Sequence, residues 1–284
     1  MIRVNVPATS ANLGPGFDVL GLAVDLYNSF IFEKADDFNV SNMITDSYKR
    51  VFDLYGQEPI PVKLTQDKSK SQVPTAGGLG SSSTCIVAGV VAALAMMGKD
   101  DDREEVLRLS NIIEGHPDNV APAIYGNLVA SIVDDDMRVH FKKFEVSDKL
   151  EFLAIVPDFS VETSLSRSVL PEKVSRPDAI SNMSRLVFLL DGFESGSMEK
   201  LRLGLVDKLH QEYRKDLVRG FEEIRTYAKE LGAGFFLSGA GATMMVVSDK
   251  DLEEEMKAYI GKNYPTYQVI KLNINDEGYK LENK

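Results

Sequence analysis

The amino-acid sequence predicts a chain that mixes helices and strands around one glycine-rich loop. The loop, VPTAGGLGSSS at residues 73–83, leads into a run of small and apolar residues from Thr84 to Met97, which has the composition and length of a buried helix. At the start of the chain, Ile2, Val4 and Val6 alternate with polar residues, as in a strand with one buried face. With 284 residues, the chain is long enough for one large or two modest domains.

The first half of the chain alternates predicted strands with predicted helices. Pro7 is expected to end the first strand, and Gly98 is a natural stop after the buried helix. Asp102, with Glu105 three residues later, is an N-cap candidate for the helix that follows. The strands or apolar segments predicted here cover residues 2–6, 20–24, 30–32, 61–64, 128–133, 139–144 and 152–156, and a further helix covers 43–55.

The second half is predicted to carry helices first and short strands later. A change of domain is expected near residue 152, although no proline- or glycine-rich linker marks it. The helices are predicted over residues 178–190, 198–209, 217–231 and 249–260, and the strands over 234–237, 244–247 and 267–272. Gly232 is the expected C′ residue of the third helix and Asp249 the expected cap of the last. Residues 275–284 are expected to be a frayed tail.

Composition narrows the class of protein. A net charge of −11 argues against nucleic acid or an anionic membrane as the main partner. Cys85 is the only cysteine, which excludes an internal disulfide, and its place in the apolar helix predicts a buried structural thiol. The first residues lack the apolar region of a signal peptide, and the central helix has the composition of a core, so we expect a cytoplasmic protein.

The glycine-rich loop has the features of an anion site. It precedes a helix N-terminus, where free N–H groups and the helix dipole favour a phosphate. No Gly-Lys-Ser/Thr follows at the spacing of a Walker A motif, so a polyphosphate here would depend on amides, hydroxyls and a metal cation. The simpler alternative is a loop that only connects a strand to a core helix.

Three further polar clusters have the chemistry of a site. Asn12 and Asp18 bracket a Gly-Pro-Gly turn, where both residue types are also common turn-formers. Thr163 and Arg167 share one face if their segment is helical, and an arginine fork matches a carboxylate, although most arginines are solvated. The segment EGHPDNV at residues 114–120 gathers a glutamate, a histidine, an aspartate and an asparagine at a break between helices.

A carboxylate in this last cluster, close to the phosphate loop, is a candidate metal ligand. Mg²⁺ prefers one or two carboxylates together with phosphate oxygens and water. The competing interpretation is that Asp118 only caps a helix that begins at Pro117.

Several of these segments resemble known kinases. PxxxGLGSS resembles the nucleotide loop of the galactokinase, homoserine kinase, mevalonate kinase and phosphomevalonate kinase superfamily, the GHMP kinases. PATSANLGPGFDVLGLA, GHPDNVAPAIYG and ETSxSRxVLP resemble the homoserine kinases in particular. These are also similar to this chain in lacking a lysine at the position of Thr9, which many other members of the superfamily carry.

Two segments depart slightly from the family pattern. HxxYR supplies Arg214, with Glu212 in place of an expected proline. SGAGAT resembles the third motif of the superfamily, usually LSGSGPT, with Ala240 and Ala242 in place of serine and proline; both glycines remain, so the turn is expected to keep its shape. The resembling segments occur in the family's order along nearly the whole chain.

The resemblance implies a fold and a reaction. The fold is the α+β, two-domain GHMP kinase fold, with an N-terminal ATP-binding domain over residues 1–152, a ferredoxin-like C-terminal domain over 153–284, and the active site between them. The reaction is ATP-dependent phosphorylation of the side-chain hydroxyl of L-homoserine to O-phospho-L-homoserine, in threonine biosynthesis, with Mg²⁺. The sequence does not determine the oligomeric state, and a homodimer is compatible with it.

The resemblance also implies roles for individual residues. Ser82 and Glu114 are the expected metal ligands and, with Asn119 near the attacking hydroxyl, the expected catalytic residues. The expected ATP-binding residues are Val73, Pro74, Thr75, Ala76, Gly77, Gly78, Leu79, Gly80, Ser81, Ser82 and Ser83. The expected substrate-binding residues are Asn12, Asp18, His116, Asp118, Asn119, Thr163, Arg167, Arg214 and Gly239.

Two chemical arguments favour an amino-acid substrate. Arg167 and Arg214 can bind a carboxylate, and Asp18 and Asn12 can accept hydrogen bonds from an ammonium group. No residue stands out as a general base, so we expect Asn119 to position the hydroxyl, which loses its proton late, to the phosphate itself. The alternatives are another GHMP kinase acting on a mevalonate-like or sugar substrate, a non-catalytic nucleotide-binding relative, and an RNA-associated domain, which the charge disfavours.

Overall fold

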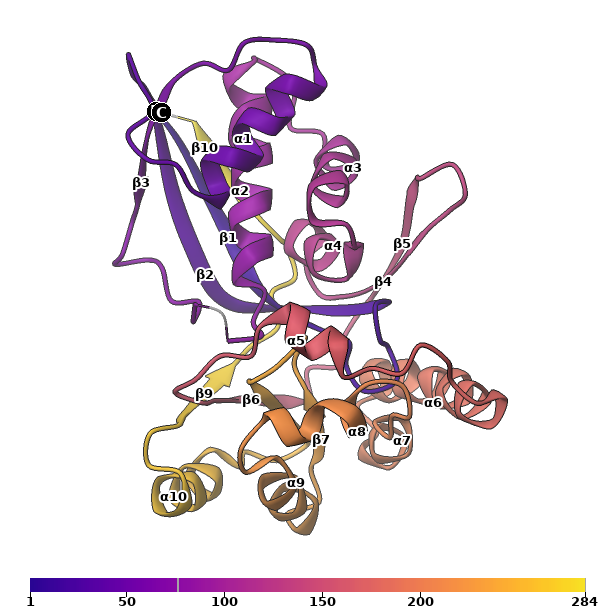
Figure 1. The fold of residues 1–284 in the computed structure, drawn as a ribbon. Coiled ribbons are helices and arrows are strands. Elements are labelled where there is room, and N and C mark those ends of the chain that lie inside the picture. Colours follow the sequence, from indigo (N-terminus) through magenta and orange to yellow (C-terminus); the bar gives the residue numbers. More distant parts are fainter. Residues whose placement is uncertain (76, 284) are drawn as a thin grey trace.

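The computed structural model describes residues 1–75 and 77–283, which fold around two antiparallel sheets (Figure 1). Within the described residues the first sheet has six strands, in the order β10-β1-β2-β4-β5 with β3 beside β2, and the second has the order β7-β8-β6-β9. The strands of the first sheet are β1 (Ile2–Ala11), β2 (Leu20–Lys34), β3 (Val62–Gln66), β4 (Leu128–Val133), β5 (Val139–Phe144) and β10 (Lys280–Asn283). The strands of the second are β6 (Glu151–Val156), β7 (Gly234–Leu237), β8 (Met244–Ser248) and β9 (Gln268–Leu272).

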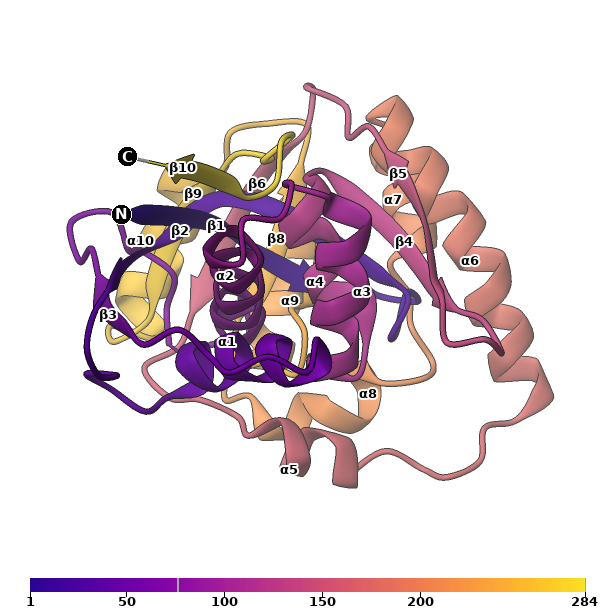
Figure 2. The same ribbon diagram turned by 90° about the horizontal axis from the view of Figure 1, so that it is seen from above.

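Four helices cover one face of the first sheet, as Figure 2 shows. They are α1 (Met43–Leu54), α2 (Ser81–Met96), α3 (Arg103–Glu114) and α4 (Pro117–Tyr125). The predicted central helix is α2, whose apolar side chains are buried almost without interruption from Ile86 to Leu94. Gly89 permits the close crossing of α1, because a Cβ there would lie 2.5 Å from the Ile44 carbonyl oxygen. This packing fixes the N-terminus of α2 at the end of the sheet that faces the second part of the chain.

The second sheet has the ferredoxin-like order that the sequence resemblance implied. Its strands follow one another as β6, β7, β8 and β9, with helices between β6 and β7 and between β8 and β9. Helices α9 (Phe221–Glu230) and α10 (Glu253–Asn263) pack on it. The segment between β6 and β7 also contains α5 (Thr163–Ser168), α6 (Arg176–Ser195), α7 (Met198–Gly204), α8 (Gln211–Arg214) and the 3-10 turn η1 (Lys215–Leu217). The α+β class is confirmed, whereas the boundary at 152/153 stays a prediction.

The prediction that Pro7 ends the first strand is wrong. β1 continues to Ala11, and its pairing with β2 shifts register between Pro7 and Ala8. A bulge of this kind lets a residue without an N–H group remain within a sheet. The continuation matters because it carries Thr9 and Asn12 to the end of the sheet. The apolar segments at 20–24 and 30–32 are likewise parts of one long strand, β2.

The prediction of a frayed tail is also wrong. β10 pairs with β1, with Asn283 opposite Ile2, so the two ends of the chain lie side by side (Figures 1 and 2). Tyr279 is only 1% exposed, and the Arg103 guanidinium lies 5.0 Å from its ring centroid. The hydrophobic pattern alone misses this strand because it is short and polar, and its partner is the far end of the sequence.

Three helix boundaries differ from the sequence prediction. The helix predicted over 198–209 ends at Gly204, and the one predicted from residue 217 begins at Phe221, after η1. The last helix begins at Glu253, whose N–H is accepted by the Asp251 carboxylate rather than by Asp249. No helix in the described part of the chain combines the length and apolar character needed to cross a bilayer.

Candidate active site

A cavity of about 460 Å³ is lined by residues from the N-terminus of α2 and from the helices α5 and α8. Figure 1 shows these two helices on the side of the N-terminus of α2. Its walls come from the glycine-rich loop, the junction of α3 and α4, the residues before and within α5, Arg214 of α8, and the turn between β7 and β8. Segments that are far apart in the sequence therefore line one cavity. This is the arrangement expected of a small-molecule site.

The loop is held by close backbone contacts that only glycine permits. Gly78 has φ +86°, and a Cβ there would lie 2.6 Å from the Ser238 carbonyl oxygen. The Ser238 hydroxyl donates to the Gly78 carbonyl at 2.6 Å, and the Thr243 N–H donates to the Gly77 carbonyl at 3.0 Å. These hydrogen bonds hold the loop against the turn between β7 and β8, and so fix its position at the N-terminus of α2.

The N-terminus of α2 is open to a ligand. Its N-cap, Gly80, has φ +65° and offers no side-chain oxygen to the first N–H groups of the helix. Unsatisfied N–H groups at a helix start are partners for an anion. Ser81, Ser82 and Ser83 all line the cavity at this point, beside these amides.

Ser82, Ser83 and Glu114 form a compact oxygen cluster. The Ser82 hydroxyl donates to Glu114 Oε2 at 3.3 Å and the Ser83 hydroxyl to Oε1 at 3.1 Å. Burial raises the pKa of Glu114, and the nearby His116 and the two hydroxyls partly oppose that rise. The described residues contain no group of three or more His, Cys, Asp or Glu placed to hold a metal. One carboxylate and one hydroxyl do fit Mg²⁺, which completes its shell with phosphate oxygens and water.

Two polar side chains at the start of α4, His116 and Asn119, line the cavity, and each is held in place by a hydrogen bond. His116 Nδ1 lies 2.7 Å from Asp118 Oδ1, and this hydrogen bond is the main reason that the pKa of His116 is raised. Asp118 is 2% exposed, so it is held by this contact rather than solvated. The Thr9 hydroxyl donates to Asn119 Oδ1 at 2.8 Å, which leaves the amide nitrogen of Asn119 for the cavity.

Two arginines form the opposite wall. Arg167 makes a bidentate pair with Asp18, with both N–O distances 3.1 Å. Arg214 is 2% exposed, and its Nε and Nη1 donate to the carbonyls of Ser166 and Gly239 at 3.1 and 3.2 Å. Burial, helped by the positive charge of Arg167, lowers the pKa of Arg214 to about 10, so it stays charged at neutral pH. Its remaining nitrogen, Nη2, makes no hydrogen bond within the described residues and is free for an anion.

His210 fixes the position of Arg214 and does not act as a base toward the cavity. Its Nε2 lies 2.8 Å from the Gly14 carbonyl, to which it donates, so Nδ1 is the acceptor for Arg214 Nη1 at 3.3 Å. Burial lowers the pKa of His210, which keeps it neutral. The Asp207 carboxylate accepts the N–H groups of His210 and Gln211 and anchors the start of α8.

Most of the residues expected in the site do line this cavity. They are Asn12, Asp18, Thr75, Gly77, Gly78, Gly80, Ser81, Ser82, Ser83, Glu114, His116, Asp118, Asn119, Thr163, Arg167, Arg214 and Gly239. Pro74 does not line it, and Val73 and Leu79 belong to the hydrophobic core, where they support the loop. Ala76 lies outside the described residues. The amide of Asn12 already bonds the Gly239 carbonyl and the Asp18 N–H, so its role toward substrate stays a prediction.

Sequence reasoning missed several contributors. Phe17 stacks on His210 at 5.2 Å and lies beneath the Arg214 guanidinium at 5.0 Å, yet an aromatic residue in a glycine-rich turn carries no sequence signal of this role. Met43 lines the cavity from the start of α1. Cys85 is half-buried and also lines it, whereas the sequence predicted a fully enclosed thiol; burial raises its pKa, which keeps it protonated and unreactive.

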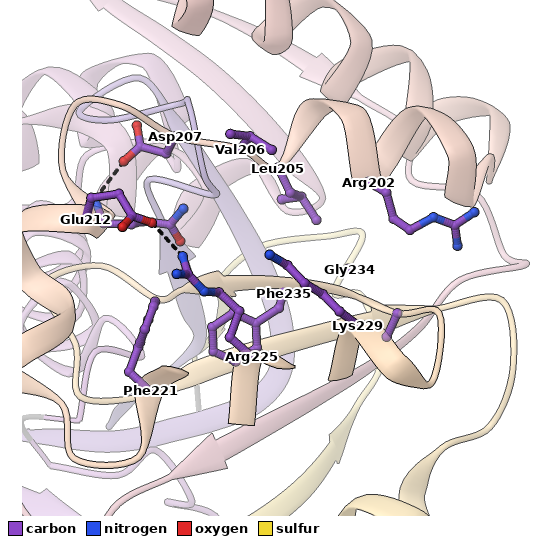
Figure 3. Close-up of a pocket in the computed structure, with 12 residues that line it drawn as sticks. Arg202, Leu205, Val206, Asp207, Glu212, Phe221, Arg225, Lys229, Gly234 and Phe235 are labelled. Carbon is purple, nitrogen blue, oxygen red and sulfur yellow. Dashed lines mark hydrogen bonds and ion pairs between the residues drawn. The ribbon is translucent and has the colours of Figure 1, made fainter. Parts of the chain in front are cut away.

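A second cavity, of about 450 Å³, is lined by residues from α7, α8, α9 and β7 (Figure 3). Both of its arginines are already engaged: Arg225 contacts Glu212 at 2.5 Å, and Arg202 donates to the Gly232 carbonyl. Among the residues that the structure describes, none of those expected in the site lines this cavity. We therefore place the site in the first cavity.

Comparison with known proteins agrees with this architecture. The family model described as GHMP kinases N terminal domain matches residues 42–127, and the one described as GHMP kinases C terminal matches residues 189–266. The chain is similar to the homoserine kinase of Clostridium beijerinckii, with 40% identity over 295 residues that cover 100% of this chain and 97% of that protein. It is 38% identical to the homoserine kinase of Clostridium botulinum (strain Langeland) over 299 residues, covering 100% and 99% of the two chains.

A solved structure is similar over the same extent. The crystal structure of homoserine kinase from Cytophaga hutchinsonii superimposes with a TM-score of 0.85 at 26% identity, covering 99% of this chain and 97% of that one. The similarity therefore extends over both sheets.

Proposed function

We propose that this chain, which belongs to the homoserine kinase family of GHMP kinases, transfers the γ-phosphoryl group of ATP to the side-chain hydroxyl of L-homoserine. The product is O-phospho-L-homoserine, and the reaction is a step of threonine biosynthesis. We place it in the cytoplasm, where ATP and amino acids are at hand.

One observation supports the proposal above all others. The N-terminus of α2, which suits a phosphate, and the two arginines Arg167 and Arg214 line the same cavity. The open end of α2 and the pair Ser82–Glu114 suit a metal-bound polyphosphate. Arg167 and Arg214 on the other wall suit a carboxylate. A ligand that spans the cavity must therefore join a phosphate acceptor to a carboxylate, which an amino acid with a side-chain hydroxyl does.

On the nucleotide side, the residues bind and orient phosphate. The N–H groups at the start of α2 and the hydroxyl of Ser81 contact the phosphate oxygens. Ser82 and Glu114 would hold Mg²⁺, which neutralises charge on the transferring group when bound. Because phosphoryl transfer depends on positioning and charge neutralisation, this wall supplies most of the catalysis.

On the amino-acid side, the residues hold the acceptor in line. Arg214 Nη2 and the N–H groups of Arg167 that do not bond Asp18 take the α-carboxylate, and Asp18, beside Arg167, takes the α-ammonium. The free amide nitrogen of Asn119 donates a hydrogen bond to the oxygen of the acceptor hydroxyl. This orients a lone pair of that hydroxyl oxygen toward the phosphate. An amide is not a base, so the hydroxyl keeps its proton until late and passes it to the transferred phosphate.

A coupled ADP-release assay with ATP and Mg²⁺ tests the proposal. L-Homoserine is compared with L-serine, L-threonine, mevalonate and galactose. We expect turnover with homoserine alone, and loss of it in Arg214→Ala. Turnover with mevalonate or galactose instead would keep the kinase assignment and reject the carboxylate role of the arginines. ATP binding without turnover of any acceptor would reject the catalytic assignment.

A further inference from the structure

The second cavity, of about 450 Å³, combines an apolar lining with a few charged groups (Figure 3). Phe221 and Phe235 are buried, and their rings pack edge to face with centroids 5.1 Å apart. Leu205 and Ala233, also buried, line the same cavity, where Val206 remains 40% exposed. A concave, largely apolar surface of this size with a small number of polar groups is typical of a site for a small molecule.

Lys229 supplies an unpaired positive charge to this cavity. Within the part of the chain that the structure describes, its ammonium group has no hydrogen bond and no ion pair. Lys229 lies four residues after Arg225 in α9, so the two like charges share one face of the helix and repel each other. Figure 3 shows the Lys229 side chain extending toward Arg225, whereas Arg202 lies apart from both.

The charge of the lining favours an anion. Three cationic and two anionic side chains line the cavity, although the whole chain has a net charge of −11. A local excess of positive charge in a hollow attracts a negative ligand. A single negative charge would bring the lining to neutrality, whereas a phosphate monoester, with close to two charges, would exceed it. The cavity therefore suits a carboxylate better than a phosphate.

The two carboxylates of the cavity are already engaged. The Asp207 carboxylate accepts three backbone N–H groups and the side-chain amide of Asn182. The Glu212 carboxylate accepts a hydrogen bond from Arg225 at 2.5 Å and another from Lys215 at 2.9 Å. An ammonium group on the ligand would have to displace one of these partners. The ligand that fits is therefore a carboxylate without an ammonium group, which an amino acid is not.

We propose that the second cavity is a binding site for a small carboxylate that carries an apolar group and no ammonium group. Lys229 binds the carboxylate through a charge-assisted hydrogen bond. The apolar group packs against the side chains of Phe235 and Val206. The site is separate from the first cavity, because Gln211 and Glu212 of α8 line the second cavity whereas Arg214 of the same helix lines the first.

Helix α8 couples the two cavities. A carboxylate on Lys229 competes with Glu212 for Arg225, the residue that holds this part of α8 against α9. Weakening that ion pair loosens the helix that carries Arg214, so the ligand should weaken binding of homoserine in the first cavity. This coupling rests on the proposed function, whereas binding in the second cavity does not.

Isothermal titration calorimetry with 3-phenylpropanoate tests the binding. We expect Lys229→Gln to raise Kd about tenfold or more, because it removes a charge-assisted hydrogen bond. The neutral 3-phenylpropanamide should bind the unaltered chain more weakly by about the same factor. Lys262→Gln is a matched control, since Lys262 is also an exposed lysine in the last turn of a helix, α10, but lines neither cavity. Its Kd should equal that of the unaltered chain.

The first cavity is the competing place for this probe, because its arginines also suit a carboxylate. Binding that Arg167→Ala abolishes and Lys229→Gln leaves unchanged would overturn the proposal. Absence of binding to the unaltered chain would overturn it as well. Neither result depends on which acceptor the chain phosphorylates, so calorimetry decides the binding even if the proposed reaction is wrong.

Steady-state kinetics test the coupling. Saturating 3-phenylpropanoate should raise KM for homoserine in the unaltered chain and in Lys262→Gln, but not in Lys229→Gln. An equal rise in Lys229→Gln would mean that the probe acts in the first cavity and would reject the coupling through α8. An unchanged KM in the unaltered chain, with the probe bound, would reject it too.

Discussion

The Thr9 hydroxyl donates a 2.8 Å hydrogen bond to the amide oxygen of Asn119. Thr9 is completely buried, and its N–H also donates to the Leu79 carbonyl of the loop, at 3.3 Å. Thr9 thus sets the orientation of Asn119 with its side chain and contacts the phosphate loop with its backbone. Many GHMP kinases carry a lysine at the position of Thr9. Here the residue positions a neighbour instead of supplying a charge, which agrees with a site that has no dedicated base.

Removing this hydroxyl should slow turnover. Thr9→Val keeps the shape of the side chain but leaves the Asn119 amide free to rotate. A neutral hydrogen bond contributes about 1 kcal/mol, so we expect kcat to fall about fivefold, with little change in KM for ATP. Steady-state kinetics measure both. Thr9→Ser retains the hydroxyl and should retain most of the rate; an equal loss in both variants would mean that only packing matters.

Breaking the pair of Arg167 and Asp18 should weaken binding of the amino acid but not of ATP. The two side chains are 42% and 36% exposed, so the pair itself adds little to stability. Arg167→Ala should raise KM for homoserine about 100-fold, because charge-assisted bonds to a carboxylate are worth about 1.5–3 kcal/mol. Asp18→Asn keeps the shape and tests the ammonium contact. Unchanged KM in both variants would exclude these residues from substrate binding.

A methyl group on Gly78 should disrupt the phosphate loop. It would clash with the Ser238 and Gly241 carbonyl oxygens, at 2.6 and 2.8 Å, and backbone atoms cannot move aside cheaply. We expect Gly78→Ala to raise KM for ATP by about tenfold or more. Gly98→Ala is a matched control, since Gly98 also has positive φ (+70°) but nothing lies within 4 Å of its added Cβ. If both variants raise KM for ATP equally, the cause is the strain of a positive φ at a non-glycine residue and not the clash with the carbonyl oxygens.

Glu114 should make Mg²⁺ binding depend on pH. Burial raises its pKa above 4.5, so in the metal-free protein its contribution to stability is greatest below that value and is lost as pH rises through the folded pKa. Mg²⁺ requires the carboxylate and should therefore bind more tightly as pH rises through the same range.

Glu114→Gln separates these two effects. At neutral pH it should raise the unfolding temperature of the metal-free protein, yet abolish the further increase that Mg²⁺ gives to the unaltered chain. Activity should fall about 100-fold, because a catalytic metal contributes several kcal/mol. Differential scanning calorimetry without and with Mg²⁺ measures the unfolding temperature of the metal-free protein and its increase on metal binding. An Mg²⁺-induced increase that survives in Glu114→Gln would remove this residue from the metal site.

The C-terminal segment should be needed for stability. Tyr279 is buried against the first sheet, so Tyr279→Ala should cost about 3 kcal/mol. Lys280→Ala, at an exposed position in the next residue, should change stability by less than about 0.5 kcal/mol. Thermal unfolding followed by circular dichroism compares the two. Equal midpoints would mean that β10 adds nothing to the fold.

The sequence was most informative where local periodicity decides the structure. The buried helix α2, the N-cap Asp102 of α3 and the alternating strands β4 and β5 lie where the pattern predicts them. Motif order also predicted the two-domain GHMP kinase fold, which family membership bears out. In each case the signal is contained within a short segment, because side-chain burial and capping repeat with the period of the backbone.

The tertiary structure decided what distant segments do to one another. Asp18 and Arg167 are 149 residues apart, and no local pattern shows that they pair. The same holds for Tyr279 in the core, for the bulge that carries β1 past Pro7, and for Phe17 packed against His210 and Arg214. The sequence by itself determined most of the elements and which residue types are available for chemistry. Their orientation and pairing were decided only when the two sheets packed, because burial and hydrogen bonding between remote side chains depend on the whole fold.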